Sequence, residues 1–162
     1  MNIIGIAGYS GSGKTTLVVR LIPEIRRRGL TVSTVKHTHH NVSIDKKGSL
    51  TRLLRDAGAI DVVVAAEDHW ALLHEHRGAP EPSLEDLARR MKPVDILLVE
   101  GFKTHSHDKI EVHRPAAGKP LLYTGDPYII AIATDGVLSD TALPQLDLNN
   151  VSEICDFIIE RM

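Results

Sequence analysis

The chain has 162 residues, 43% of them hydrophobic and 25% charged, and this composition is typical of one folded domain with a substantial core, which we expect over residues 1–162. Its formal net charge of -2 gives no reason to expect nucleic acid or a membrane as a partner. The single Cys155 excludes an internal disulfide and a cysteine-based metal cluster, and because no signal peptide or membrane-spanning segment is evident, we expect a cytoplasmic protein.

The first elements of the chain are predicted to be a strand, a helix and a second strand. Residues 2–7, NIIGIA, predict a short buried strand. Apolar residues at helical spacing follow from Lys14, and they predict one helix that passes through Pro23 and ends at Gly29. Residues 30–38 are rich in β-branched side chains and predict the second strand, which leads into a long polar segment.

The next part of the chain predicts a short helix and two consecutive strands. The helix is expected over residues 50–57. DVVVAAE and HWALLHEH, residues 61–67 and 69–76, predict strands that pair as an antiparallel hairpin. Trp70 is the only tryptophan, and packing in the core is its expected role.

The second half of the chain predicts two helices and three strands. One helix follows Ser83, which together with Asp86 can form a capping box. The C-terminal helix begins near Asn150, which is expected to form a reciprocal cap with Glu153 and to place Cys155 in the core. The strands are expected at residues 94–101, 109–114 and 129–135.

Because strands and helices alternate, and because residues 8–16, GYSGSGKTT, place a phosphate-binding loop (P-loop) between the first strand and the first helix, we predict a three-layer α/β sandwich of the P-loop type, with a mostly parallel sheet and a β-hairpin extension. Residues 69–76 and 109–114 are candidates for edge strands that could pair with another chain.

The strongest motif is a phosphate-binding loop. Residues 8–16, GYSGSGKTT, fit the pattern G-x-x-x-x-G-K-[ST] between a predicted strand and a predicted helix. Its amides would face phosphate oxygens, its lysine would reach the terminal phosphates, and its first threonine would bind Mg²⁺. The predicted nucleotide-binding residues of this loop are Gly8, Gly11, Ser12, Gly13, Lys14, Thr15 and Thr16.

The metal site needs an acidic partner as well. Glu100 ends the predicted strand DILLVE, and ligands of parallel sheets gather at the carboxyl ends of strands. We therefore predict that Thr15 and Glu100 hold Mg²⁺, and that Lys14 and Glu100 belong to the catalytic residues. Asp95 opens the same strand at the opposite edge, so a structural role is expected for it.

A polar cluster follows the second strand, and it consists of Lys36, His37, His39, His40 and Asp45. The histidines could bind a transition metal, but their spacing is not diagnostic. Alternatively, the cluster contacts phosphate or an anionic partner, or it is simply a polar loop exposed to solvent. Lys36 and His37 are predicted to contact the nucleotide, and Asp45 is predicted to act in catalysis by orienting water or a magnesium ligand.

Four segments together resemble the MobB family of molybdopterin-guanine dinucleotide biosynthesis adapter proteins. They are GYSGSGKTTL; VKHTHH with IDKKG and RDAGA; LLVEGFK; and KIEVHR with AIATD. The resemblance implies a homodimer that binds GTP with Mg²⁺ and hydrolyses it slowly at most. It implies that the protein assists a molybdopterin guanylyltransferase of the MobA type, with molybdopterin as a further candidate ligand.

The same resemblance suggests roles for further residues. Thr134 and Asp135 would lie on the guanine side, because a carboxylate can accept hydrogen bonds from the guanine N1–H and N2 amine. Glu100 and Gly101 would lie on the metal side. The chain departs from the family pattern at Lys47, Ser49 and Leu50, which puts in question what the acidic residue of that loop does here.

Two other functions remain open at the level of sequence. A P-loop small-molecule kinase would need an arginine-bearing lid, for which only Arg52 and Arg55 are candidates. A GTP-dependent metallochaperone would use His37, His39 and His40 to carry nickel or zinc. We favour the GTP-binding adapter, and we expect slow hydrolysis because no glutamine or arginine finger is evident near the loop.

Overall fold

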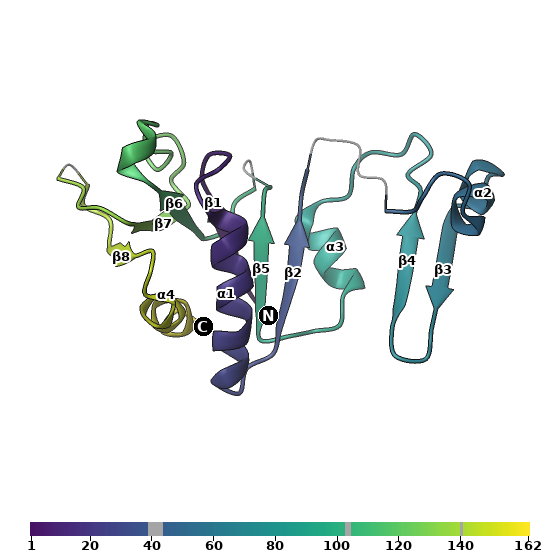
Figure 1. Cartoon of the computed structure of the whole chain (residues 1–162), viewed down its shortest axis with the longest axis horizontal. Helices are drawn as coiled ribbons and strands as arrows, with labels where there is room; N and C mark the ends of the chain where they lie inside the picture. The colour runs from purple at the N-terminus through teal and green to yellow at the C-terminus, as the bar shows by residue number, and fades with distance from the viewer. Residues whose placement is uncertain (39–43, 103–104, 140) are drawn as a thin grey trace. The chain divides into compact units, whose positions relative to one another are not determined.

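The structure is a computed structural model that describes residues 1–38, 44–102, 105–139 and 141–162. These residues fall into two units, a main unit of Met1–His37 and Met91–Met162 and a hairpin unit of Thr38–Arg90. Figure 1 labels the helices and strands of both. The single domain predicted over residues 1–162 remains a prediction. No helix among the described residues is long and apolar enough to cross a membrane.

The main unit is built on a six-stranded sheet in the order β2-β5-β1-β6-β7-β8, and every neighbouring pair is parallel. This confirms the predicted sheet, in which the carboxyl ends of the strands lie along one edge. The three-residue β8 was not predicted because it is too short to show a pattern. The strands are β1 (Asn2–Ala7), β2 (Val32–Lys36), β5 (Ile96–Glu100), β6 (Lys109–His113), β7 (Ile129–Thr134) and β8 (Gln145–Asp147).

Two helices share one face of this sheet. They are α1 (Lys14–Arg27) and α4 (Val151–Ile159), which lie side by side in Figure 1 and contact each other. Helical spacing brings the buried side chains of α1 onto one stripe, where they join apolar residues of the strands and of α4 in a single cluster. Cys155 is buried there, as predicted, and α1 runs through Pro23 as one helix.

Strand β5 is an interior strand of the sheet, between β2 and β1. Its residues Ile96 to Val99 are at most 1% exposed, as expected for a strand covered on both faces. At its start, Asp95 accepts hydrogen bonds from the Thr31 backbone N–H and hydroxyl at 2.7 and 2.6 Å. These bonds hold the pKa of Asp95 below its usual value. Asp95 therefore has the structural contacts that its position predicted.

The expectation that residues 109–114 form an edge strand is wrong. Strand β6 lies between β1 and β7, and all five of its residues are buried. Its charged side chains find partners inside the unit: Glu111 accepts hydrogen bonds from two backbone N–H groups at 2.8 and 3.0 Å, and Lys109 pairs with Asp126 at 2.8 Å. The alternation of polar residues therefore indicated paired burial and not exposure to solvent.

The hairpin unit contains α2 (Leu50–Asp56), β3 (Asp61–Ala65), β4 (Trp70–His74) and α3 (Leu84–Arg90). Strands β3 and β4 pair in an antiparallel two-stranded sheet, which confirms the predicted hairpin. The predicted capping box of α3 is present, because the Ser83 hydroxyl accepts from the Asp86 N–H at 3.1 Å and the Asp86 carboxylate accepts from the Ser83 N–H at 3.3 Å.

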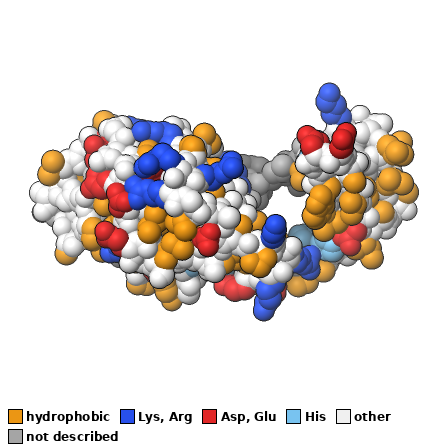
Figure 2. Space-filling model, turned by 90° about the horizontal axis from the view of Figure 1, so that it is seen from below, with side chains coloured by type: hydrophobic (Ala, Val, Ile, Leu, Met, Phe, Trp, Pro, Cys, Tyr) orange, Lys and Arg blue, Asp and Glu red, His pale blue; other side chains and the backbone are white. Residues whose placement is uncertain are grey.

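Trp70 does not lie in a core, contrary to the prediction, and its side chain is 68% exposed. Because side chains alternate along a strand, Val62 and Leu73 are buried on one face of the hairpin, and Trp70 and Leu72 lie on the other. Helix α2 contacts β3, and a two-stranded sheet with one covered face leaves the other face open. Figure 2 shows hydrophobic side chains at the surface of this unit.

Candidate functional site

The phosphate-binding loop joins the end of β1 to the start of α1, in the strand–loop–helix order that the motif requires. Glycine is needed at its first position, since Gly8 has φ 140° and a Cβ there would lie 2.6 Å from the Val112 carbonyl oxygen. Gly13 is the left-handed N-cap of α1, with φ 104°. The loop therefore presents the helix N-terminus, which attracts phosphate, at the carboxyl edge of the sheet.

A pocket of about 400 Å³ lies over this loop. Most of the residues that were predicted to hold the phosphates and metal line it, and so does Lys36 from the end of β2. The full set is Ser10, Gly11, Gly13, Lys14, Thr15, Thr16, Lys36 and Glu100.

The proposed metal ligands meet within this pocket. Thr15 Oγ1 lies 3.2 and 3.1 Å from the two carboxylate oxygens of Glu100, to which it donates a hydrogen bond. Lys36 Nζ lies 3.6 Å from Glu100 Oε1. Hydroxyl and carboxylate oxygens are hard ligands suited to Mg²⁺, which in nucleotide sites takes few protein ligands and completes its shell with phosphate and water. The donor set therefore fits a magnesium ion.

Lys14 begins α1 at the floor of the pocket, and its Nζ donates a hydrogen bond to the Tyr9 carbonyl at 2.7 Å. This places the ammonium group over the loop backbone, beside the amides that would face the phosphates. Together with Lys36 it gives the pocket two ammonium groups and one carboxylate, a balance that suits an anionic ligand bound with a cation.

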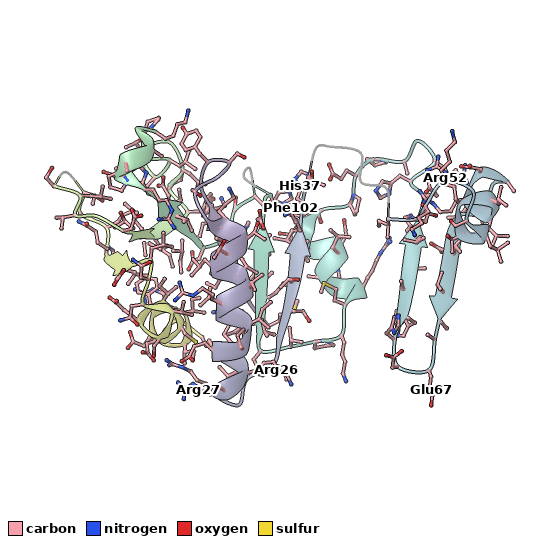
Figure 3. The ribbon with its side chains drawn as sticks, viewed as in Figure 1. Arg26, Arg27, His37, Arg52, Glu67 and Phe102 are labelled. Atoms are coloured by element: carbon pink, nitrogen blue, oxygen red, sulfur yellow. The ribbon has the colours of Figure 1, made fainter. Side chains whose placement is uncertain are left out.

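The turn after Glu100 packs closely against the end of β2. Gly101 has φ 99°, and a Cβ there would lie 2.7 Å from His37 Cβ and 2.8 Å from its carbonyl oxygen. The His37 ring packs on Phe102, with 4.5 Å between ring centroids. Figure 3 labels these two residues at neighbouring positions. The His37 N–H donates to the Glu100 carbonyl at 2.8 Å. His37 therefore supports the turn that carries Glu100.

A second pocket, of about 410 Å³, lies at the ends of β7 and β8. Thr134 and Asp135 line it, together with Gln145, Asp147 and Asn149. The Thr134 hydroxyl donates to the Gly136 carbonyl at 3.0 Å, so it shapes the turn, and Asp135 contributes a carboxylate to the pocket. The predicted base-side residues therefore lie on the same sheet edge as the phosphate loop.

Arg114 was not predicted from the sequence as a site residue, and it contacts both regions. Its Nε donates a hydrogen bond to the Ser12 carbonyl at 3.0 Å, and its Nη1 pairs with Asp135 Oδ2. The signal was available, because Arg114 is a charged residue directly after the strand KIEVH, at the ligand edge of the sheet.

Asp45 lies in the hairpin unit, where its carboxylate pairs with Arg55 Nη1 at 2.7 Å; Arg55 also pairs with Glu75. Burial raises the pKa of Asp45, but the hydrogen bond and charge of Arg55 outweigh it and keep this pKa below its usual value. Its catalytic role remains a prediction. His39 and His40 lie outside the described residues. Within the described residues, no three His, Cys, Asp or Glu side chains form a metal-binding group.

Comparison with known proteins agrees with this geometry. The family model for molybdopterin guanine dinucleotide synthesis protein B (MobB) matches residues 3–135. The chain is similar to the molybdopterin-guanine dinucleotide biosynthesis adapter proteins of Haemophilus influenzae, with 43% identity over 96% of this chain and 86% of the relative, and of Escherichia coli, with 42% identity over 99% and 93%. A crystal structure of molybdopterin-guanine biosynthesis protein B superposes with a TM-score of 0.78 at 26% identity and covers 99% of both chains. The chain belongs to the MobB family.

Proposed function

We propose that this chain is a GTP-binding adapter protein of molybdenum cofactor biosynthesis. In this role it binds GTP with Mg²⁺ and assists the guanylyltransferase that attaches GMP to molybdopterin. Membership of the MobB family supports the proposal, as do the two bacterial relatives that are named as adapter proteins of this pathway.

The observation that carries the nucleotide part of the proposal is the contact between Thr15 and Glu100 above the phosphate loop. Thr15 and Glu100 would hold Mg²⁺, which would supply positive charge to neutralise the phosphates. Lys14 would bind the terminal phosphates, and the loop amides with Thr16 would bind the others.

Preference for guanine is proposed to come from the pocket at β7 and β8. The Asp135 carboxylate can accept hydrogen bonds from the guanine N1–H and N2 amine. Adenine presents a lone pair at N1 in place of the N–H, so the same carboxylate disfavours it. A hydrogen bond to a charged group contributes about 1.5–3 kcal/mol, which corresponds to about 10- to 140-fold in affinity.

Hydrolysis in this adapter is proposed to be slow. Arg114 lies against the phosphate loop, but its guanidinium is already bound to the Ser12 carbonyl and to Asp135. The chain has one glutamine, Gln145, which lies on β8 and hydrogen-bonds the backbone of Leu138 at 2.9 and 2.7 Å. Gln145 thus lines the pocket at the ends of β7 and β8, which we call the base-side pocket, and not the pocket over the phosphate loop. Lys14, Glu100 and Asp45 remain the proposed catalytic residues for the slow reaction.

Calorimetric titration with nucleotides tests this function. We expect GTP to bind more tightly than ATP, with an affinity that falls when EDTA removes Mg²⁺. Lys14→Ala serves as the variant with a damaged loop, and it should lose affinity for both nucleotides. Equal affinity for GTP and ATP, or equal affinity for GTP with Mg²⁺ and with EDTA, would contradict the proposal.

A homodimer is proposed as the working form, and the open face of the hairpin is the candidate contact surface. An isolated two-stranded sheet is only marginally stable, and here its open face carries apolar side chains such as Val63, Trp70 and Leu72. Light scattering should give the mass of a dimer for the native chain and a lower mass for Trp70→Glu. An unchanged mass in the variant would show that the dimer contact does not depend on the open face of the hairpin. The cytoplasmic location stays a prediction.

A further inference from the structure

Arg114 joins the phosphate loop to the base-side pocket through two separate contacts. Its Nε donates to the Ser12 carbonyl at 3.0 Å, and its Nη1 pairs with Asp135. Its Nη2 lies 3.4 Å from the position that a Cβ on Gly13 would occupy, so the guanidinium lies directly against the loop where α1 begins. One side chain therefore spans the space between the two regions.

The surroundings hold both ends of this connection in place. Pro115 Cγ lies 3.2 Å from the position of a Cβ on Gly136, so the segment after Arg114 packs against the turn after Asp135. In that turn, the Thr134 hydroxyl donates to the Gly136 carbonyl and accepts from its N–H, at 3.0 and 3.3 Å. The backbone on each side of the Arg114–Asp135 pair is thus fixed by contacts of its own.

We propose that Arg114 is a positioning residue that sets the base specificity of the nucleotide site. By pairing with Asp135 while it is hydrogen-bonded to the phosphate loop, it fixes the carboxylate in the register that guanine requires. This inference rests on the proposed GTP-binding function and names a residue through which that site selects its base.

The chemistry of the pair allows this role. A guanidinium donates through a rigid planar fork, so contacts from Nε and Nη1 orient its two acceptors relative to each other. A carboxylate has about four lone-pair sites, and the contact with Arg114 engages Oδ2. The carboxylate so held can still accept the two donors on the guanine edge. Without Arg114, Asp135 would turn freely and lose its alignment with a base bound at the loop.

A role confined to the phosphate loop predicts a different result. The contact with Ser12 alone would support the loop under any nucleoside triphosphate, so its loss would weaken GTP and ATP equally. A role in base selection changes the ratio of the two affinities. The GTP-to-ATP affinity ratio is therefore the quantity that separates the two roles.

The experiment measures binding of GTP, ATP and xanthosine triphosphate, each with Mg²⁺, to the full chain, to four single variants and to the Arg114→Gln/Asp135→Asn double variant. Arg114→Gln removes the charge and the fork, and Arg114→Lys keeps the charge but cannot bridge both acceptors. Asp135→Asn replaces the carboxylate by an amide, whose N–H₂ matches the C2 carbonyl of xanthine. Arg27→Gln is the matched control, because Arg27 pairs with Glu24 at 2.7 Å at the far end of α1 (Figure 3).

We expect Arg114→Gln to lower the GTP-to-ATP affinity ratio about tenfold, through weaker GTP binding, and Arg114→Lys to lower it less. Asp135→Asn should lower it by a similar factor and bind xanthosine triphosphate better than GTP, and the Arg114→Gln/Asp135→Asn double variant should lose little more. Arg27→Gln should keep the native ratio. If either Arg114 variant keeps the native ratio, or weakens both nucleotides equally, the inference fails. A native chain that binds GTP and ATP equally contradicts the proposed function as well.

Discussion

Glu100→Gln removes one negative charge from the proposed magnesium site while keeping its shape. Both carboxylate oxygens lie 3.1–3.2 Å from Thr15 Oγ1, and the Glu100 side chain is only 16% exposed. Unit charges 4 Å apart attract by about 4 kcal/mol at an effective dielectric constant of about 20. The double charge of Mg²⁺ increases this energy, whereas solvent access and the remaining amide oxygen reduce it. We expect a net loss of about 2–4 kcal/mol, or about 30- to 700-fold weaker binding of Mg²⁺–GTP.

The assay for this variant is calorimetric titration of GTP with excess Mg²⁺ and again with EDTA. In EDTA, Glu100→Gln should bind GTP at least as well as the native chain, because a carboxylate that repels the phosphates is gone. Glu153→Gln, in the first turn of α4, is the matched control and should bind like the native chain. An equal loss in Mg²⁺ and in EDTA, or no loss in Mg²⁺, would refute the assignment of Glu100 to the metal.

Three further predictions concern stability. Gly101→Ala should lower the Tm more than Gly29→Ala. Both glycines have positive φ, which costs an alanine about 1–2 kcal/mol, but only at Gly101 does the new methyl group meet neighbours within 3 Å. An equal fall in Tm for the two variants would contradict the close approach at Gly101. Lys109→Met leaves the Asp126 carboxylate without its ion-pair partner and should lower the free energy of unfolding in urea by about 3–5 kcal/mol, and adding Asp126→Asn should restore most of this stability. If the second substitution restores none of it, the ion pair is not the cause of the loss. Because the pKa of Asp95 is lowered in the folded chain, its carboxylate stabilises the fold above about pH 4, and this stabilisation is lost as the pH falls through the folded pKa. The Tm difference between the native chain and Asp95→Asn should therefore shrink on acidification. A Tm difference independent of pH would contradict this.

Much of the fold follows from local patterns in the sequence. The apolar run of β5 predicts a buried parallel strand, and Ser83 with Asp86 predicts the start of α3. The prediction of an edge strand at residues 109–114 failed because burial there depends on contacts with residues outside the strand. The charges of β6 resemble those of an exposed strand, and only the partners that Glu111 and Lys109 find in residues 105–126 explain their burial.

In the candidate site, too, some residues could be predicted from local sequence patterns and others could not. The loop motif predicts the positions of Lys14 and Thr15, and the end of a buried strand predicts Glu100, because parallel strands share one ligand edge. Arg114 lies at that edge too, but its contact with Asp135 depends on the order of β6 and β7 in the sheet. Sequence spacing does not give strand order, so this pair could be found only in the structure.

Capture of the molybdopterin guanylyltransferase on this chain, with and without GTP, tests directly whether the chain is a GTP-dependent adapter. We predict a complex that forms with GTP and Mg²⁺ and is reduced both in EDTA and in Lys14→Ala, while the Arg27→Gln variant captures the enzyme like the native chain. Failure to capture the enzyme under any of these conditions, or capture that is identical with and without nucleotide, would contradict a GTP-dependent adapter.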